Sequence, residues 1–366
     1  MDPAEIQAMQ WNVSLVRIGV CWLISAAFAS MEAAEIAPPD IPGLEVSIGR
    51  RQVIIEDRTY PHMFKFADGD ILVCTKRSGD GGKTWRDAPA LTDSVYQFPD
   101  GQVTAIGFLT KKSDRPGVFH IPLVTSTDNG ATLHQGTAIM NIPEGTGGID
   151  DGGKPFDGPA CDHAVVALRD GSLLAGMYGY FRTDTVRVAE FPQWNIYKYR
   201  TFVVRSCDRG KTWDYLATVA YDPTIGQESF CEPDLLVLPD GEILCFMRTG
   251  GNAGKFTPLY LSRSADDGKT WSKPEPVADR GVWPNACRMK NGVIVCTYGR
   301  PDSWLMFSLD DGKTWTGHFC FHKGQGPDYN LVEEVAPDTL LVIHNHRRDA
   351  DDKYDVMGLN VTVRRR

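Results

Sequence analysis

Short apolar runs that flank two-residue turns are the dominant pattern along this chain. The apolar stretch 235–238, for example, precedes Asp240-Gly241, and the apolar stretch 243–246 follows it. Asp-Gly and Asn-Gly pairs between apolar runs are strong signals for the tight turn of a β-hairpin. The pattern therefore predicts six hairpins, and no segment has a long helical period. Five of the turns begin at Asp68, Asp100, Asp170, Asp240 and Asn291, and Pro337-Asp338 takes the same place in the sixth.

A second repeat follows five of the six hairpins and has the pattern Ser-x-Asp-x-Gly-x-Thr with Trp or Leu after it. Ser and Asp side chains bond backbone N–H groups a few residues on, Gly allows positive φ, and Trp is a large apolar anchor. The aspartates have a catalytic or metal-binding interpretation and a structural one. We favour the structural one, since five equivalent sites would imply five equivalent reactions. The copies begin at Ser78, Ser126, Ser206, Ser264 and Ser308.

Each hairpin, together with the strands on either side of the box that follows it, makes a sheet of about four strands. Six such units predict an all-β fold, a six-bladed β-propeller over residues 44–366. The apolar segment 356–361 is expected to pair with 44–48 or 53–55, which would close the ring and remove exposed edges. A β-sandwich is the alternative, but the six-fold repeat favours the propeller.

Residues 1–34 have the features of a secretory signal peptide. Arg17 precedes the apolar run 18–24, and Ala27 and Ala29 offer a small-x-small cleavage site. The run is short for a membrane span; a buried N-terminal helix or a retained anchor is the alternative. Residues 35–43, with three prolines, are typical of a linker. We therefore expect a secreted or periplasmic protein without a membrane span after the signal is removed.

Charge and cysteine content bear on partners and cofactors. The formal net charge of -9 argues against a nucleic-acid or anionic-membrane partner. Nine cysteines are scattered without a CxxC pair or a cluster with histidines, so neither a metal site nor a cofactor is predicted. Disulfides and the oligomeric state are left open by this spacing.

Propellers bind ligands where the inner strands of their blades converge. Three arginines, Arg77, Arg248 and Arg300, lie eight or nine residues after a turn. Arginine clusters bind carboxylates because the planar guanidinium matches both oxygens. Alternatively, each arginine is a solvated surface residue or is paired with a neighbouring aspartate. Polar residues shortly before the turns are further candidates for the site, namely His62, Asp162, His163, Glu232, Asn285 and Tyr329.

The boxes resemble the Asp-boxes, or bacterial neuraminidase repeats, of the sialidase superfamily, and the resemblance covers roughly residues 50–365. The segment from Glu232 to Arg248 resembles the sialidase segment that carries a catalytic glutamate and, one hairpin later, a carboxylate-binding arginine. The 298–300 segment resembles the region of another such arginine, and the 328–331 segment resembles the region of the nucleophilic tyrosine.

The resemblance implies an exo-glycosidase that hydrolyses a terminal α-linked sialic acid, or a related acidic sugar, of a glycan or glycoconjugate. Tyr329 would be the nucleophile and Glu232 its base, while Arg248 and Arg300 would hold the substrate carboxylate. A phenol suits this role because the substrate's own carboxylate would repel a carboxylate nucleophile. The alternatives are a packed aromatic residue for Tyr329 and a charge paired with an arginine for Glu232.

The sequence departs from the family pattern at two places. Arg58 is one residue out of register with the first carboxylate-binding arginine of the family, and Arg77 is an alternative for that role. The family's general-acid aspartate has no counterpart in the 75–78 segment. Asp162 is the candidate acid because, like Glu232, it lies eight residues before its turn. Other candidate acids are Asp150, Asp151, Asp157, His62 and His163, and His62 is also a candidate for substrate binding.

Two alternatives to a sialidase are a hydrolase of another anionic glycan and a carbohydrate-binding propeller without catalysis. An enzyme needs a protonated group within hydrogen-bond reach of the leaving oxygen, whereas a binding protein needs only the arginines and aromatic residues. The aromatic insert 178–197 is either a lid that stacks on a sugar or a packed loop.

Overall fold

The computed structural model describes residues 39–366, apart from 93, 150–154, 164, 191, 195, 253–254, 325, 328 and 349–350. The predicted signal peptide and the first residues of the predicted linker lie outside this part of the chain. The described residues form strands and one short 3-10 helix, η2 (Pro192–Trp194). Within the same residues no helix has the length and apolar character that a membrane crossing requires. The predicted all-β class is confirmed.

Four of the five sheets in the described residues have four strands. The first contains β2 (Met63–Lys65), β3 (Ile71–Val73), β4 (Lys76–Ser78) and β5 (Arg86–Asp87). Another contains β17 (Cys231–Val237), β18 (Ile243–Arg248), β19 (Leu259–Ser264) and β20 (Glu275–Ala278). The next contains β21 (Val282–Arg288), β22 (Ile294–Gly299), β23 (Ser303–Ser308) and β24 (Thr316–His322). The last contains β25 (Asn330–Ala336), β26 (Thr339–Arg347), β27 (Tyr354–Arg365) and β1 (Leu44–Ile55).

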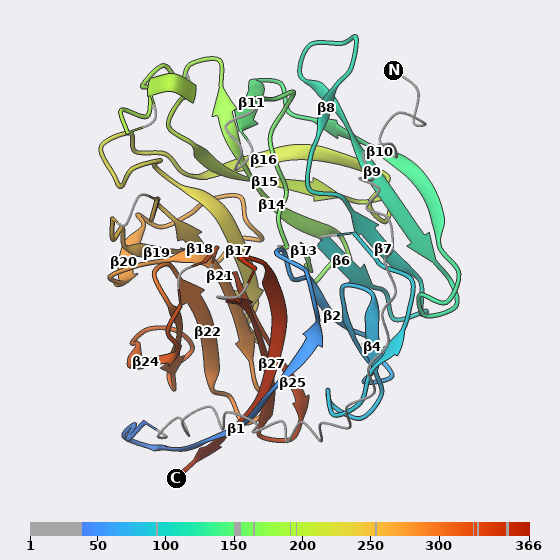
Figure 1. Ribbon diagram of the computed structural model, residues 1–366. Helices are drawn as coiled ribbons and strands as arrows, with labels where there is room; N and C mark the ends of the chain where they lie inside the picture. The colour runs from blue at the N-terminus through green and yellow to red at the C-terminus, as the bar shows by residue number, and fades with distance from the viewer. Residues whose placement is uncertain are drawn as a thin grey trace, which may run out of the picture. The chain divides into compact units, whose positions relative to one another are not determined.

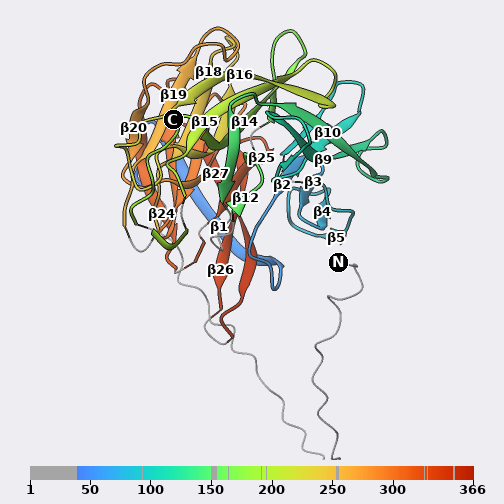
Figure 2. The ribbon, with the colours of Figure 1, turned by 90° about the horizontal axis from the view of Figure 1, so that it is seen from above.

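The fifth sheet has eleven strands and is larger than one repeat unit predicts. It contains two antiparallel runs, which join because β10 and β16 pair in parallel over three residues each. Figure 2 shows β9 and β10 side by side in one of these runs. The number of sheets alone therefore does not confirm the predicted six blades. The strands are β6 (Ser94–Gln97), β7 (Val103–Ile106), β8 (Lys111–Lys112), β9 (Val118–Ser126), β10 (His134–Asn141), β11 (Gly145–Ile149), β12 (Pro155–Phe156), β13 (Val165–Ala167), β14 (Leu173–Phe181), β15 (Arg200–Ser206) and β16 (Thr212–Ala220).

All six predicted hairpins are present. The antiparallel pairs β2–β3, β6–β7, β13–β14, β17–β18, β21–β22 and β25–β26 are each joined across one of the predicted turns. Gly241 has φ +89°, and Asp338, which takes the place of glycine in the sixth turn, has φ +56°. Tight turns between antiparallel strands use such positive φ values. Local turn chemistry therefore explains this part of the fold.

The five boxes are turns held by their own side chains. The Ser206 hydroxyl accepts a hydrogen bond from the Gly210 N–H (2.8 Å), and Asp208 accepts one from the Thr212 N–H (2.8 Å). The other four copies repeat both bonds. Hydrogen bonds from Thr270 lower the pKa of the equivalent Asp266 to about 2. Each aspartate is thus engaged within its own turn, in agreement with the structural interpretation.

The first strand of the described chain pairs with the last. β1 is antiparallel to β27, with Leu44 opposite Arg365 and Ile55 opposite Val356, and the two strands lie side by side in Figure 1. The expected pairing of the 356–361 segment is therefore confirmed for 53–55, which lie opposite 356–357, whereas 44–48 lie opposite 361–365. Backbone hydrogen bonds along this pair satisfy the edge of β27, which would otherwise be exposed.

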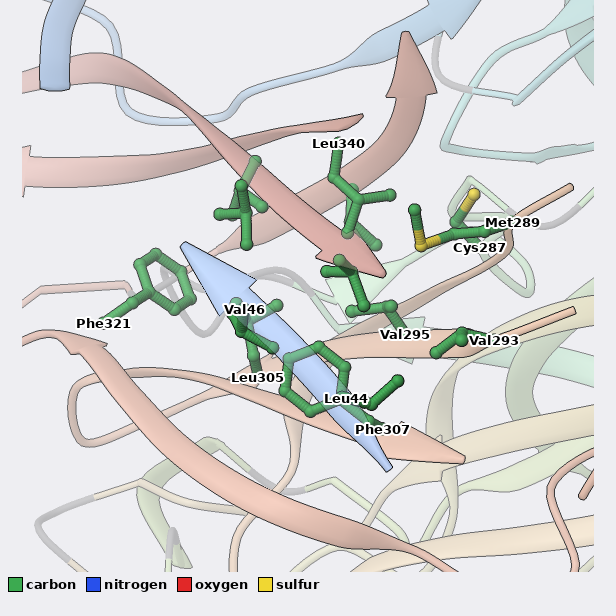
Figure 3. Close-up of a cluster of buried hydrophobic side chains, with 14 of the residues drawn as sticks. Leu44, Val46, Cys287, Met289, Val293, Val295, Leu305, Phe307, Phe321 and Leu340 are labelled. Carbon is green, nitrogen blue, oxygen red and sulfur yellow. The ribbon is translucent and has the colours of Figure 1, made fainter. Parts of the chain in front are cut away.

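β1 also contributes to an apolar core between two sheets. Leu44 and Val46 are buried against Met289, Val295 and Phe307 from the sheet of β21–β24 (Figure 3). Burial of one such side chain contributes about 1.5–3 kcal/mol. The pairing of β1 with β27 is therefore supported by side-chain packing as well as by the backbone.

We expect Asp208→Ala to lower the free energy of unfolding by roughly 1–2 kcal/mol, because the Thr212 and Lys211 N–H groups lose their acceptor. Thermal and urea denaturation measure this effect. Since Asp208 serves its turn, catalytic turnover per folded molecule should not change. A variant with an unaltered melting temperature but no turnover would contradict the structural interpretation of the boxes.

Three histidines at the ends of β24 and β26 lie against one another. The ring centres of His322 and His344 are 4.4 Å apart, and those of His322 and His346 are 5.3 Å apart. Burial, together with the charge of Arg51, lowers the pKa of His322 to about 3. Burial also holds the pKa of His344 well below its ordinary value. Both rings are neutral in the folded protein at pH values where an unfolded histidine is protonated.

The free energy of unfolding should therefore fall as the pH decreases below about 6.5, because the unfolded chain binds protons that the folded chain excludes. Each such histidine contributes at most about 1.4 kcal/mol per pH unit. Urea denaturation between about pH 7.5 and 5.5 measures the slope. His322→Asn should reduce it, whereas His120→Asn, at an exposed position, should not. An unchanged slope in His322→Asn would refute this assignment.

Candidate active site

A cavity of about 330 Å³ is lined by segments that are far apart in the sequence. It contains four of the predicted site residues, Glu232, Arg248, Arg300 and Tyr329. The charged and amide side chains in its wall are Glu228, Glu232, Arg248, Asn252 and Arg300. The aromatic side chains are Tyr60, Tyr178, Tyr199, Tyr329 and Tyr354.

A common position in the repeat explains how these side chains converge. Glu232 and Tyr329 lie eight residues before the first residue of their turns, and so do Tyr60 and Trp283. Glu232 and Trp283 have positive φ (+42° and +51°) where the registers of β17 and β21 shift. Such a bulge bends the strand and re-aims its side chain, and positive φ is uncommon outside glycine. The same backbone bulge therefore positions different side chains in different repeat units.

Arg248 is buried and bonded through all three guanidinium nitrogens. Nε donates to the Gly250 carbonyl (2.7 Å), Nη1 donates to Glu232 Oε1, and Nη2 donates to Asn252 Oδ1 (3.1 Å). Glu228 Oε2 lies 3.5 Å from Nη2. Burial opposes the charged form of Arg248, but the carboxylates of Glu232 and Glu228 outweigh it and raise the pKa of the arginine. Removal of this one cation would leave two buried carboxylates without their counter-ion.

Arg300 follows β22 and faces the same cavity. Its Nη1 donates to Asn252 Oδ1 (3.0 Å) and its Nη2 donates to the Pro327 carbonyl (2.6 Å). Asn252 Oδ1 accepts from both Arg248 and Arg300, so the two guanidinium groups are held close together. Two adjacent arginines of this kind suit a carboxylate ligand.

Tyr329 packs between aromatic neighbours and is 1% exposed. Its ring stacks on Tyr60 with 5.3 Å between ring centres, and its centre lies 4.3 Å from that of Trp283. The guanidinium of Arg300 is 5.5 Å from the ring centre. A negative charge on Tyr329 is also close enough to raise the pKa of Arg248. Both arginines would therefore stabilise a phenolate at this position.

Asp162 is 1% exposed and is not among the residues that line the cavity. It lies near the wall, because burial and then the charge of Asp162 raise the pKa of Tyr178. Its role as the acid stays a prediction. Asp157, another candidate, is exposed. The two further aspartates, Asp150 and Asp151, lie outside the described residues.

The structure does not bring Arg77 to the cavity. Its guanidinium donates to Asp70 (2.6 Å) and to the Asn129 carbonyl (2.6 Å), and lies 4.0 Å from the centre of the Phe66 ring. β3 has only three residues, so the chain has already reversed at residue 77, which is opposite Leu72. The same number of residues after the turn reaches the end of the outgoing strand in β18. In this sheet it reaches the returning strand, and the side chain lies back toward the turn. The prediction that Arg77 takes the role of the first carboxylate-binding arginine does not fit this position.

Arg58 and His62 are also not among the lining residues. Arg58 is exposed, and its Nε donates to the carbonyl of Tyr60 (3.1 Å), although Thr59 and Tyr60 do line the wall. His62 lines a separate small cavity with Cys74. The lining residues thus include two arginines, rather than the three that the family resemblance implies.

The aromatic insert 178–197 is packed, and its first residue, Tyr178, forms part of the wall together with Tyr199, which lies just after the insert. Tyr178 and Tyr199 line the cavity and meet edge to face with 5.4 Å between ring centres. Tyr180 meets Tyr197 in the same way at 5.3 Å. Burial raises the pKa of both Tyr178 and Tyr199, so their hydroxyls are neutral.

Several wall residues were not predicted from the sequence. The eight-residue offset would have identified Tyr60 in the wall and also Trp283, which packs against Tyr329. Glu228 and Asn252 lie in connections between strands, where the repeat gives no signal. Within the described ranges, no group of His, Cys, Asp or Glu side chains is arranged to hold a metal ion.

Comparison with known proteins gives one family and several similar folds. The family model described as "BNR repeat-like domain" matches residues 96–336. A search of the curated proteins found no match.

Similar solved structures include a protein of unknown function from Dyadobacter fermentans, 20% identical over 88% of this chain and 100% of that one, with a TM-score of 0.64. An α-L-arabinofuranosidase from Fusarium graminearum is 16% identical over 86% and 98%, with a TM-score of 0.62. A Hadza microbial sialidase is 14% identical over 82% and 64%, with a TM-score of 0.58. These likenesses show the fold, and the family match covers more than half of the chain. The protein therefore belongs to the BNR repeat-like domain family, as its sialidase-type boxes indicate.

Proposed function

We propose that the protein is a glycoside hydrolase of the sialidase type, which removes a terminal acidic sugar from a glycan. The observation that carries this proposal is the meeting of Tyr329, the Arg248–Glu232 pair and Arg300 in one cavity. Its volume of about 330 Å³ suits one sugar ring with its substituents. We further propose that the protein is exported, on the pattern of residues 1–34 alone.

We also infer six blades. The eleven-stranded sheet contains two four-stranded antiparallel runs, β6-β7-β9-β10 and β13-β14-β15-β16, joined only at their outer strands. The inner strands contact one another in sequence, β6 with β13, β13 with β17, β17 with β21, β21 with β25 and β25 with β2. With the four separate sheets this arrangement supports a ring of six units.

In the proposed reaction Tyr329 Oη attacks the anomeric carbon and its proton passes to Glu232. The glycosidic bond breaks, and the leaving oxygen takes a proton from Asp162. Water then attacks the anomeric carbon and gives a proton to Asp162, while Tyr329 leaves and regains its proton from Glu232. A neutral phenol approaches an anionic substrate without repulsion, and Arg248 stabilises the negative charge that builds up on the phenol oxygen as its proton moves to Glu232.

Asp162 is the proposed general acid in this scheme. Its burial is the environment that keeps a carboxylic acid protonated. Glu228 lines the cavity, but its carboxylate is already engaged, because it accepts a hydrogen bond from Asn252 (2.7 Å) and lies 3.5 Å from Arg248. We therefore keep Asp162 as the proposed acid.

A neutral sugar is the second candidate substrate, because of the charge balance of the wall. Glu228 and Glu232 offset Arg248 and Arg300, and Arg248 is already engaged by both carboxylates. A similar fold occurs in an α-L-arabinofuranosidase. In this candidate the same carboxylates would act on a furanoside with no anionic group.

A panel of fluorogenic glycosides separates these possibilities: an α-sialoside, an α- and a β-uronide, and an α-L-arabinofuranoside. We expect turnover of an acidic glycoside by the protein lacking residues 1–34. Tyr329→Phe should abolish it, since the ring keeps its packing but loses the nucleophile. Wild-type activity in Tyr329→Phe would disprove the mechanism. Turnover of only the arabinofuranoside would favour the neutral substrate, and no turnover by a folded protein would favour a binding propeller.

The two arginines should differ in their variants. Arg300→Ala should raise KM for the acidic glycoside about 10- to 100-fold, because a charge-assisted hydrogen bond contributes about 1.5–3 kcal/mol. Arg300→Lys should recover part of this loss. Arg248→Ala should in addition destabilise the fold by roughly 3–5 kcal/mol, since two buried carboxylates lose their cation. Equal melting temperatures for Arg248→Ala and Arg300→Ala would argue against this distinction.

A further inference from the structure

The 283–286 segment near the start of β21 contacts both the proposed base and the proposed nucleophile through its first residue, Trp283. The backbone N–H of Trp283 donates to Glu232 Oε2 (3.2 Å). The indole ring of the same residue lies 4.3 Å, centre to centre, from the phenol ring of Tyr329. Trp283 therefore touches the proposed base through its backbone and the proposed nucleophile through its side chain.

The rest of the segment is held from three sides. His163 Nε2 bonds the Pro284 carbonyl (2.8 Å), so this nitrogen carries the proton. Asp234 Oδ2 accepts the Ala286 N–H (2.7 Å). The side chain of Asn285 accepts the N–H of Val332 (2.8 Å).

Each of these partners is a close chain neighbour of a proposed catalytic residue. His163 follows Asp162, Asp234 is two residues after Glu232, and Val332 is three residues after Tyr329. The segment thus links the three regions of the chain that carry the proposed acid, base and nucleophile. Bonds of this kind fix the relative positions of groups that no shared strand connects.

We propose that the 283–286 segment, fastened by Asp234 and His163, is a positioning unit that fixes the ring of Tyr329 relative to the carboxylate of Glu232. This inference rests on the proposed function for its effect on catalysis, and on the geometry alone for its effect on the ring pair. Asp234 and His163 are positioning residues, because they act on the reacting groups through the segment.

The protonation state of Asp234 bears on this unit. Asp234 is 3% exposed, and burial raises its pKa to about 7. His163 Nε2 lies 3.5 Å from its Oδ1, Asn285 Nδ2 lies 3.5 Å from its Oδ2, and the thiols of Cys245 and Cys296 face it from β18 and β22. Ionisation of Asp234 strengthens the bonds that it accepts from Ala286 and Asn285. It also draws the His163 proton from Pro284 toward Oδ1, so the bonds that hold the segment rearrange as the pH rises through neutrality.

The first arm of the test uses kinetics with a matched control. Asp234→Ala should lower kcat by roughly tenfold to a hundredfold with little change in KM, because the groups are misplaced while the binding arginines remain. Asp234→Asn, which keeps an acceptor for Ala286, should recover most of kcat. Glu334 is the control: it is 5% exposed and accepts the Lys290 N–H (2.8 Å) at the other end of β21.

Glu334→Ala should lower the melting temperature about as much as Asp234→Ala but leave kcat unchanged. An equal loss of kcat in both alanine variants would mean general loosening and would overturn the proposal. Full kcat in a folded Asp234→Ala would overturn it as well.

The second arm needs no substrate. Near-ultraviolet circular dichroism reports the Trp283–Tyr329 ring pair, and subtraction of the Trp283→Phe spectrum assigns its band. The band should change between about pH 6 and 8 in the wild type and stay constant in Asp234→Asn. A band that is constant in the wild type would overturn the proposal. If the band changes as expected but the protein is inactive on every glycoside, the positioning unit is supported and the proposed function is rejected.

Discussion

The pairing of β1 with β27 is the constraint on which the arrangement of the cavity depends. It places the first strand of the described chain in the same sheet as β25, which begins directly after Tyr329. Tyr60 lies a few residues after β1, so this backbone pairing determines where the two tyrosines meet. The apolar core around Leu44 and Val46 stabilises the same pairing. A contact in the cavity wall is therefore maintained by hydrogen bonds and packing elsewhere in the sheet.

The buried positive and negative charges in the cavity wall compensate one another. Arg248 is 4% exposed and Glu232 is 4% exposed, so neither charge is tolerable without the other. Asn252, which is uncharged, links the Arg248–Glu232 pair to Arg300 because its Oδ1 accepts hydrogen bonds from both arginines. The lining of the cavity combines this polar cluster with the aromatic side chains of Tyr60, Tyr178 and Tyr199. Charged groups held in this way interact more strongly than they would in solvent.

Local chemistry explains why so much of the fold was predictable. Asp-Gly turns and Ser/Asp boxes determine their own conformations, and the structure shows the bonds that the side chains were expected to make. Glu232, Arg248, Arg300 and Tyr329 meet in one cavity, as their similar offsets from the turns predict for units with long strands. Arg77 does not reach the cavity because β3 is short, and no pattern in the sequence indicates the length of this strand. Glu228 and Asn252 depend on tertiary contacts between loops, and the identity of an acid depends on burial, which a sequence does not reveal.

The position eight residues before each turn has a consequence for how such proteins change. In the described units it carries tyrosine, threonine, aspartate, glutamate, tryptophan and tyrosine again, at Tyr60, Thr92, Asp162, Glu232, Trp283 and Tyr329. The turn and box that build each unit do not use this position. Tyr60, Glu232 and Tyr329 line the cavity, so natural or laboratory evolution can alter its wall at these positions without changing a turn or a box, provided that a buried charge keeps its counter-ion.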